Sequence, residues 1–237
     1  MAKRLFDIVA SLTALVVLSP VFLIAAVGIR LLDGGPIFFL ARRVGLNGEL
    51  FTMHKFRTMR VTQGTAASII SSSGDSRVFP FGRLLRRLKI DELPQLYDVL
   101  RGKMSIVGPR PEDPAIVRDH YAPEHMETLT VRPGLASPGS IYNYTHGEEL
   151  IGQGAPERDY VERLLPVKLA LEQVYVRNAS LWYDLRVIFR TIGVIVRIAC
   201  GQRGGDPPEM AKIDRLVPAR NTDIAASQRL DEPPQRR

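Results

Sequence analysis

Cysteine and histidine are scarce in this chain, which has one cysteine and four histidines among 237 residues. The single cysteine, Cys200, excludes an internal disulfide and fits a reducing compartment. The histidines and this cysteine show none of the spacings typical of zinc ligands. Internal repeats are also absent from the sequence. These absences exclude a disulfide-bonded scaffold and a zinc module.

Acidic residues are outnumbered, because 25 Asp and Glu face 32 Lys and Arg and leave a formal net charge of +7. A basic surface suits nucleic acid, an anionic membrane leaflet or a polyanionic substrate. No basic segment carries the interleaved aromatic side chains of a nucleic-acid platform, so we expect no nucleic-acid partner. The remaining composition is ordinary, with 45% hydrophobic residues, and the length allows one domain with a sizeable core.

One uncharged run, residues 8–29, is long enough to cross a hydrocarbon core of about 30 Å at about 1.5 Å per residue. No small-residue cleavage site precedes a polar start, so we expect no cleavable signal. Ser19-Pro20 lies at the middle of the run, where proline removes a backbone hydrogen bond and should kink the helix near residues 15–17. The Ser19 hydroxyl can return a hydrogen bond to a carbonyl freed by the break.

Two topologies fit this run. Basic residues flank both of its ends, so the positive-inside bias chooses no side. They are Lys3 and Arg4 before the run, and Arg30, Arg42 and Arg43 after it. A hairpin that enters and leaves through one leaflet satisfies both flanks, whereas a proline-kinked spanning helix is the alternative. Asp7, just before the run, is expected at the depth of the headgroups.

Two short strands, residues 37–40 and 50–56, are predicted around Asn47-Gly48, a strong hairpin signal. Because side chains alternate along a strand, Lys55 and Arg57 are expected on one face. Two cations aimed one way suit a pyrophosphate, while a solvated basic face is the alternative. Residues 62–76, rich in Ser, Thr and Gly, are predicted to form a loop that either covers a site or is an idle surface.

Two adjacent carboxylates, Asp91 and Glu92, precede a predicted amphipathic helix that Gly102 ends. Its apolar positions are Leu93, Leu96, Tyr97 and Leu100. We expect Asp91 at the N-cap, with Pro94 in the first turn, where free amides and the helix dipole keep the carboxylate ionised. The same terminus can hold a phosphate, as aspartyl-phosphate chemistry requires. A plain helix cap is the alternative.

Several short motifs follow one another in a fixed order over residues 34–112. They are Gly35-Pro-Ile-Phe38, Arg43-Val-Gly45, Asn47-Gly48, Lys55-Phe-Arg-Thr-Met59, Asp91-Glu-Leu-Pro-Gln95 and Met104-Ser-Ile-Val-Gly-Pro-Arg-Pro-Glu112. Together they closely resemble the bacterial sugar transferases, the monotopic polyprenyl-phosphate phosphoglycosyl transferases that start glycan assembly. The resemblance covers residues 3–200 and weakens after Arg132. A polytopic phosphoglycosyl transferase is excluded because the chain has one long apolar run.

The resemblance implies transfer of a sugar-1-phosphate from a UDP-sugar to polyprenyl (undecaprenyl) phosphate, with release of UMP, as the first membrane step of a surface glycan pathway. Asp91 would attack the β-phosphorus to give an aspartyl-phosphosugar intermediate, Glu92 would assist, and Mg²⁺ would touch Asp91. The substrate-binding candidates are Lys55, Arg57, Arg86, Pro109, Arg110 and Glu112. A structural proline-rich turn is the alternative for the rigid loop at residues 108–112. Lys89 stands where many relatives have Ser or Thr.

The second half of the chain departs from the family pattern after Pro133-Gly134. Tyr142, Asn143, Tyr144 and His146 either contact a sugar or are ordinary loop residues. Residues 157–176 are predicted to form a helix with Leu164, Leu165, Leu169, Val174 and Val176 as its core. Ser180 should cap a further helix, whose apolar continuation over residues 185–200 is broken by three arginines. That helix lies either in a membrane interface or in a soluble core.

The expected fold class is α+β and mainly helical, with a small β-hairpin and interfacial amphipathic helices around a compact catalytic domain. Residues 1–32 would form a re-entrant helix-break-helix anchor, residues 33–200 the catalytic domain, and residues 201–237 a partly disordered tail. The expected partners are a UDP-sugar, polyprenyl phosphate and membrane lipids at the cytoplasmic face of a bacterial inner membrane. The sequence does not decide whether the chain forms a homodimer. The alternative function is a membrane-anchored lipid-binding scaffold, which would have no turnover and no need for Asp91.

Overall fold

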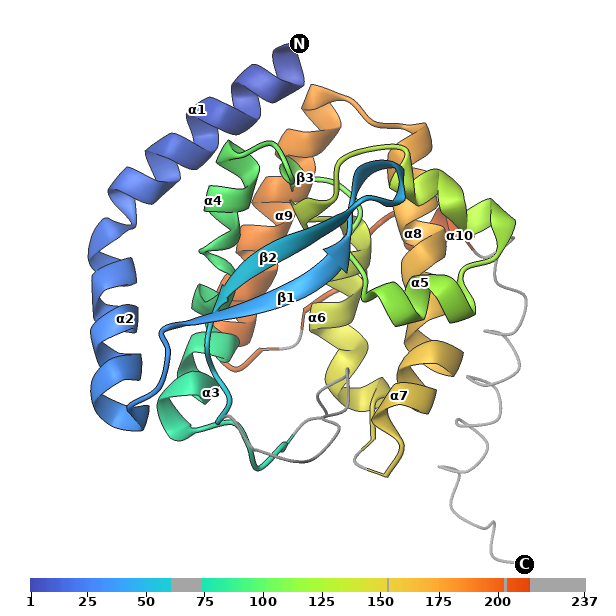
Figure 1. Ribbon diagram of the computed structural model, residues 1–237. Helices are drawn as coiled ribbons and strands as arrows, with labels where there is room; N and C mark the ends of the chain where they lie inside the picture. The colour runs from blue at the N-terminus through green and yellow to red at the C-terminus, as the bar shows by residue number, and fades with distance from the viewer. Residues whose placement is uncertain (61–73, 153, 203, 214–237) are drawn as a thin grey trace, which may run out of the picture.

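The computed structural model describes residues 1–60, 74–152, 154–202 and 204–213, which fold into a mainly helical unit with two small two-stranded sheets (Figure 1). The elements in chain order are α1 (Ala2–Val17), α2 (Ser19–Asp33), β1 (Phe38–Val44), η1 (Leu46–Gly48), β2 (Leu50–Phe56), α3 (Pro80–Arg87), η2 (Ile90–Glu92), α4 (Gln95–Leu100), β3 (Ser105–Val107), α5 (Pro114–His120), η3 (Pro123–Leu129), β4 (Gly134–Ala136), α6 (Pro138–Leu150), α7 (Pro156–Asp159), η4 (Tyr160–Leu164), α8 (Leu165–Arg177), α9 (Leu181–Ala199) and α10 (Met210–Ile213). Most of the predicted loop at residues 62–76 and the last 24 residues, 214–237, lie outside the described residues.

The apolar N-terminal run is two helices, α1 and α2, which meet at a bend of 60°. Pro20 cannot donate to the carbonyl of Val16, and the hydroxyl of Ser19 donates to that oxygen instead at 2.8 Å. The predicted helix-break-helix is therefore confirmed. Among the described residues, no single helix is long and apolar enough to cross a membrane, although the bent pair meets that test by length and composition.

The start of α1 is attached to the rest of the fold and does not stand apart from it. The Asp7 carboxylate is buried, where it accepts hydrogen bonds from the Ser105 hydroxyl at 2.9 Å and from the Ile106 amide at 3.0 Å. Arg4 donates to the carbonyl oxygens of Val99 and Leu100 at the end of α4, at 2.6 and 2.7 Å. The position of Asp7 at headgroup depth stays a prediction, and the structure adds to it a contact with buried donors of β3.

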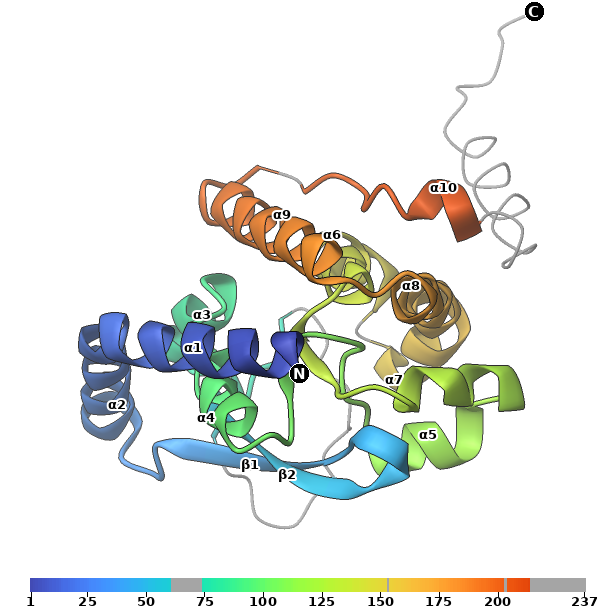
Figure 2. The same cartoon turned by 90° about the horizontal axis from the view of Figure 1, so that it is seen from above.

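Strands β1 and β2 form the predicted antiparallel hairpin, with Phe38 opposite Phe56 and Val44 opposite Leu50. Asn47 and Gly48 take positive φ values of 55° and 80°, which those two residue types adopt most readily. The hairpin crosses the front of the molecule in Figure 1, and Figure 2 shows it on the opposite side from α9, with α3, α4 and α6 between them.

A second, parallel pair of short strands, β3 and β4, was not predicted. Ser105 pairs with Gly134 and Val107 pairs with Ala136. The two backbones approach so closely at Gly108 and Gly134 that a side chain on either glycine would collide with the other strand. This pairing holds the proline-rich loop after β3 at a fixed place.

The C-terminal half supplies the largest core cluster. Predicted core positions Leu164, Leu165, Leu169 and Val174 are buried, whereas Val176 is only half-buried. The predicted single helix over residues 157–176 is α7, a π-helical turn η4, and α8. The Ser180 hydroxyl accepts from the amide of Tyr183 at 3.2 Å, which confirms the cap of α9. In the tail, α10 packs Met210 and Ile213 into the same core.

Candidate active site

Asp91 and Glu92 lie in η2, a short 3-10 turn between α3 and α4, and both side chains are buried. Helix α4 begins only at Gln95, after Pro94, and no side chain caps it. The prediction that Asp91 is the N-cap is wrong, because the Ile90–Glu92 turn separates it from the helix. The helical register is also different from the predicted one: the buried positions are Gln95, Leu96, Asp98 and Val99, whereas Tyr97 is exposed.

Glu92 is fixed by a set of donors from three other elements. Arg110 donates to both of its oxygens, at 2.9 and 2.5 Å, in the two-point geometry that guanidinium and carboxylate favour. Lys55 of β2 lies 3.5 Å from Oε1, and the Tyr144 hydroxyl of α6 donates to Oε2 at 3.1 Å. Burial acts against ionisation, yet the charges of Arg110 and Lys55 hold the pKa of Glu92 well below its usual value. Glu92 is thus a fully partnered carboxylate.

Asp91 meets the opposite situation. Its Oδ1 is buried and has no hydrogen-bond partner among the described residues. Burial, and after it the adjacent charge of Glu92, raises the pKa of Asp91, while Lys55, Lys89 and Arg86 act to lower it. We expected helix amides to keep this acid ionised. In the structure three nearby cations take that part, because they oppose the rise in pKa that burial causes. An oxygen without a partner is free to contact a ligand.

The loop that carries Arg110 is held from behind. The Arg110 amide donates to Oε1 of Glu172 at 3.2 Å, and the Ser137 hydroxyl donates to the same oxygen at 2.7 Å. The carbonyl of Pro109 accepts from the amide of Gly134 at 2.8 Å. Burial raises the pKa of Glu172 to about 7. The position of the loop predicted to be rigid therefore depends on β4 and α8 as well as on its prolines.

Glu112 points into the protein. Its carboxylate forms an ion pair with Lys168 and accepts from the Tyr160 hydroxyl at 2.5 Å, and both partners are buried. Burial acts to raise its pKa, but the Lys168 charge and the hydrogen bonds from Lys168 and Tyr160 together hold the pKa of Glu112 below its usual value. The structure thus places Glu112 as an anchor of the loop, apart from the acid pair.

Arg57 is not brought to the acid pair either. The strand ends at Phe56, and Arg57 turns to the end of α2, where it donates to Asp33 at 2.5 Å and to the carbonyl of Pro36 at 2.6 Å. The predicted shared face of Lys55 and Arg57 is not formed, because β2 stops between them. Arg57 fixes the junction between α2 and the hairpin.

Arg86 and Lys89 approach the acid pair from the end of α3. Arg86 donates to the Thr58 hydroxyl at 2.8 Å, and the Lys89 ammonium lies 3.8 Å from the centre of the Tyr144 ring. Burial lowers the pKa of each, while the charges of Asp91 and Glu92 act to raise it. Lys55, Arg86, Asp91, Glu92 and Arg110 therefore gather as predicted, and Lys89 and Tyr144 join them.

The segment after residue 137 is a helix and not a loop. The Ser137 hydroxyl accepts from the amide of Ser140 at 2.9 Å and Pro138 follows it, so α6 has a good N-cap and start. On α6, Tyr144 reaches Glu92, whereas Tyr142 is buried and His146 pairs with Asp206 at 3.2 Å. A Ser-Pro cap was the sequence signal for this helix.

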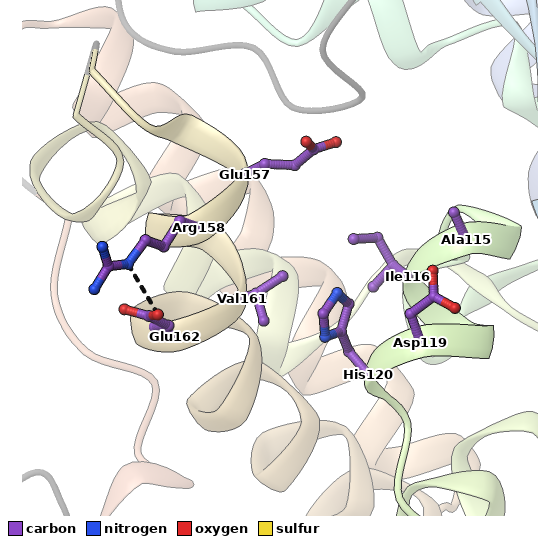
Figure 3. A pocket seen from close by; sticks show the side chains of 8 residues that line it. All are labelled: Ala115, Ile116, Asp119, His120, Glu157, Arg158, Val161 and Glu162. Carbon is purple, nitrogen blue, oxygen red and sulfur yellow. Dashed lines mark hydrogen bonds and ion pairs between the residues drawn. The ribbon is translucent and has the colours of Figure 1, made fainter.

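A surface pocket between α5 and the α7–η4 segment contains none of these groups. Figure 3 shows Glu157, Arg158 and Glu162 on one side of it, and Asp119 and His120 on the other. Its rim carries solvent-exposed charged side chains around the apolar Ala115, Ile116 and Val161, and an ion pair between Arg158 and Glu162 is already formed. Among the described residues, no group of three or more His, Cys, Asp or Glu side chains could hold a metal ion.

The chain is similar to known proteins over most of its length. A family model described as bacterial sugar transferase matches residues 1–198. A UDP-N-acetylgalactosamine-undecaprenyl-phosphate N-acetylgalactosaminephosphotransferase of Aeromonas hydrophila is 36% identical over 82% of this chain and 43% of its own length. For a UDP-glucose:undecaprenyl-phosphate glucose-1-phosphate transferase of Caulobacter vibrioides the values are 36%, 80% and 68%. For the exopolysaccharide production protein ExoY of Sinorhizobium fredii they are 36%, 86% and 87%. The chain thus spans less than half of some relatives and most of others.

Proposed function

Because this chain belongs to the bacterial sugar transferase family, we propose that it transfers a sugar-1-phosphate from a UDP-sugar to undecaprenyl or a related polyprenyl phosphate. The family membership confirms the resemblance of the sequence motifs. The single observation that carries the activity is the divided acid pair, in which Glu92 is fully partnered and Asp91 presents a buried oxygen without one. The products are a polyprenyl-diphosphate-sugar and UMP, at the first membrane step of a surface glycan pathway.

The relatives support the reaction class and disagree about the sugar. Two are named for undecaprenyl phosphate as acceptor, with N-acetylgalactosamine in one case and glucose in the other, and a third is named for exopolysaccharide production. We therefore include the UDP-sugar class and the polyprenyl acceptor in the proposal, with the particular sugar and glycan left to experiment.

In the first step, an Asp91 oxygen forms a bond to the β-phosphorus, and the bond from that phosphorus to the bridging oxygen breaks. The bridging oxygen and its electron pair leave with UMP. In the second step, an oxygen of the polyprenyl phosphate bonds to the same phosphorus, and the Asp91 carboxylate leaves. Charge balances in both steps without a proton transfer when the monoester phosphates are dianions. Glu92, whose oxygens are occupied, positions Arg110 and Lys55 and need not act as a base.

A magnesium ion fits this site through the substrate. Mg²⁺ is commonly held by one or two carboxylates together with substrate phosphates, and Asp91 is the acid here with an oxygen to spare. When bound, the ion would offset negative charge on the diphosphate. Arg110, Lys55 and Arg86 orient the diphosphate against Asp91, and the buried setting of the acid pair keeps water from the phosphorus.

The N-terminal helices give the reaction a location. We propose that the bent pair α1–α2 is a re-entrant anchor at the cytoplasmic face of the inner membrane. Trp182 and Phe189 are exposed on α9, and Arg186 lies over the Trp182 ring, as suits a helix in the headgroup region. A site beside these elements meets a lipid phosphate from the membrane and a UDP-sugar from solution.

The test is a UMP-release assay with a panel of UDP-sugars and undecaprenyl phosphate, using the full chain in detergent or nanodiscs. Wild type should release UMP with one or a few of the sugars and carry a phosphosugar adduct visible by intact mass. Asp91→Asn should lose turnover by roughly four orders of magnitude or more, as nucleophile replacements do. A wild type that releases no UMP, or an Asp91→Asn variant that turns over normally, would favour the scaffold and refute the enzyme.

A further inference from the structure

One cation of the site has no polar partner among the residues that the structure describes. The Lys89 ammonium donates no hydrogen bond to any described residue and lies against the Tyr144 ring at 3.8 Å from its centre. By contrast, the other three cations are engaged, Lys55 and Arg110 with Glu92 and Arg86 with Thr58. A partly buried ammonium that packs on an aromatic face and donates to no described residue retains its capacity for three hydrogen bonds.

The backbone of Lys89 is also unusual. Its φ of 56° and ψ of 19° lie in the left-handed region, which among non-glycine residues favours Asn and Asp. Such a conformation destabilises the folded chain and is kept where function or packing requires it. Since Gly or Asn would fit this backbone with less strain, a lysine at this position indicates that its side chain is used.

The charges around the acid pair point to the ligand. Four cations, Lys55, Arg86, Lys89 and Arg110, act on two acids, which leaves a formal excess of two positive charges when both acids are ionised. The unpartnered Oδ1 of Asp91 lies within the influence of Lys89. An anion that approaches Asp91 therefore meets one ammonium that forms no ion pair with a carboxylate of the described residues.

The two-step reaction brings the same chemical group to this place twice. Under the proposed function, on which this inference rests, UMP leaves from the side of the phosphorus opposite Asp91. The acceptor phosphate must arrive on that same side, because Asp91 is the group that it displaces. Both visitors are phosphate monoesters. We propose that Lys89 binds this shared phosphate-monoester position, so that it stabilises the departing UMP in one step and orients the polyprenyl phosphate in the other.

Two half-reactions separate the two phosphate sources. The first is the single-turnover release of UMP without acceptor, and the second is transfer from the isolated adduct to polyprenyl phosphate. Lys89→Gly and Lys89→Asn keep a backbone that tolerates positive φ and remove the charge. Each should slow both half-reactions roughly 10- to 100-fold, the range for loss of one charge-assisted hydrogen bond. Lys89→Arg should recover most of this loss, and UMP should inhibit the Gly variant less strongly by a similar factor.

The unfolding temperature and a control variant test whether the role of Lys89 is purely structural. Lys89→Gly should unfold at or above the wild-type temperature because the strain is relieved, and Lys103→Gly, at an exposed lysine, should leave both half-reactions unchanged. Three results would each overturn the proposal. The first is that both uncharged variants run both half-reactions within twofold of the wild-type rate, and the second is that the substitutions slow one half-reaction alone. The third is that Lys89→Arg is no faster than Lys89→Gly. A wild type that forms no adduct would refute the proposed function as well, which distinguishes the two failures.

Discussion

Asp91 and Glu92 are neighbours in sequence, yet their side chains meet different surroundings. The partners of Glu92 come from β2, from the loop after β3 and from α6, whereas Asp91 has an oxygen that none of them reaches. The motif in the sequence predicted the acids and several of their cations. It could not assign the two acids different roles, because that difference depends on side chains up to 52 positions away.

Arg110→Lys tests the two-point contact with Glu92. A lysine keeps the charge and cannot reproduce the paired hydrogen bonds at 2.9 and 2.5 Å. We expect kcat/KM for UMP release to fall roughly 10- to 100-fold, since hydrogen bonds to charged groups contribute about 1.5–3 kcal/mol. Arg101→Lys, at an exposed arginine over the Tyr97 ring, serves as the matched control and should stay near wild type. Equal activity of the two variants would contradict a role for the two-point contact between Arg110 and Glu92.

Glu172→Gln tests the buried acid behind the Arg110 loop. Burial raises its pKa from 4.5 to about 7, with Lys168 acting to lower it and Glu112 to raise it. Between these values the folded chain binds a proton that the unfolded chain has lost, so this group's contribution to stability falls as pH rises from about 4.5 to 7. Above pH 7 the wild type carries the full penalty, about 3 kcal/mol.

The glutamine keeps an oxygen for the Arg110 amide and has no charge to desolvate. We therefore expect the variant to unfold at a higher temperature than wild type at pH 8, and the difference to shrink towards pH 5. Thermal denaturation at the two pH values measures this directly. A variant that is less stable at pH 8 than at pH 5, relative to wild type, would show that the carboxylate is ionised and well paired in the fold.

Among the elements, those with local signals were predicted well. The Ser19-Pro20 break, the Asn47-Gly48 hairpin and the Ser180 cap each depend on residues a few positions apart in the sequence. Two contacts went unpredicted where distant partners decide the structure. Asp7 accepts hydrogen bonds from β3, and β3 pairs with a strand some 30 positions later through a contact that only glycine permits. The helix at α4 starts late because an unpredicted 3-10 turn holds both acids.

Pro20→Ala tests the break between α1 and α2. Alanine restores an amide that can donate to the Val16 carbonyl, so the 60° bend loses its cause and the two helices can become one long apolar helix. We expect the variant to span the bilayer and to place its N-terminus on the far side. A cysteine introduced at position 2, in a background with Cys200→Ser, reports its side through an impermeant thiol reagent.

Wild type should show the introduced cysteine and the C-terminal half on the same side of the membrane. Ser19→Ala is the matched variant, because it removes the substitute hydrogen bond and keeps the proline. It should retain the wild-type topology with a small loss of stability, about 1 kcal/mol for one hydrogen bond. If wild type and Ser19→Ala both place position 2 on the far side of the membrane, the re-entrant interpretation is wrong.

At the scale of the whole molecule, several contacts join the predicted anchor at residues 1–32 to the predicted catalytic domain at residues 33–200. The boundary between them was drawn from the sequence alone. Lys3 donates to Asp184 at 2.5 Å and to the carbonyl of Val107, while Arg4 binds the end of α4. Hydrophobicity alone marked the run as a membrane element. It could not show that the first two turns of α1 are part of the fold that holds the site.

Deletion of residues 1–33 should therefore fail to release a folded catalytic domain. The deletion would leave the buried carboxylate of Asp184 without its ammonium, and would remove the acceptor of the Ser105 hydroxyl and the donor at the end of α4. Asp184 is buried whereas the Lys3 side chain is 41% exposed, so loss of this ion pair costs about 1–3 kcal/mol, and each lost hydrogen bond adds about 1 kcal/mol or more. The sum is a large part of the stability of a typical domain. Deletion of residues 214–237 removes none of these contacts and is the control, expected to keep the wild-type proteolysis pattern and UMP release. A soluble chain without residues 1–33 that resists protease and unfolds at the temperature of the full chain would show that α1 is an anchor alone.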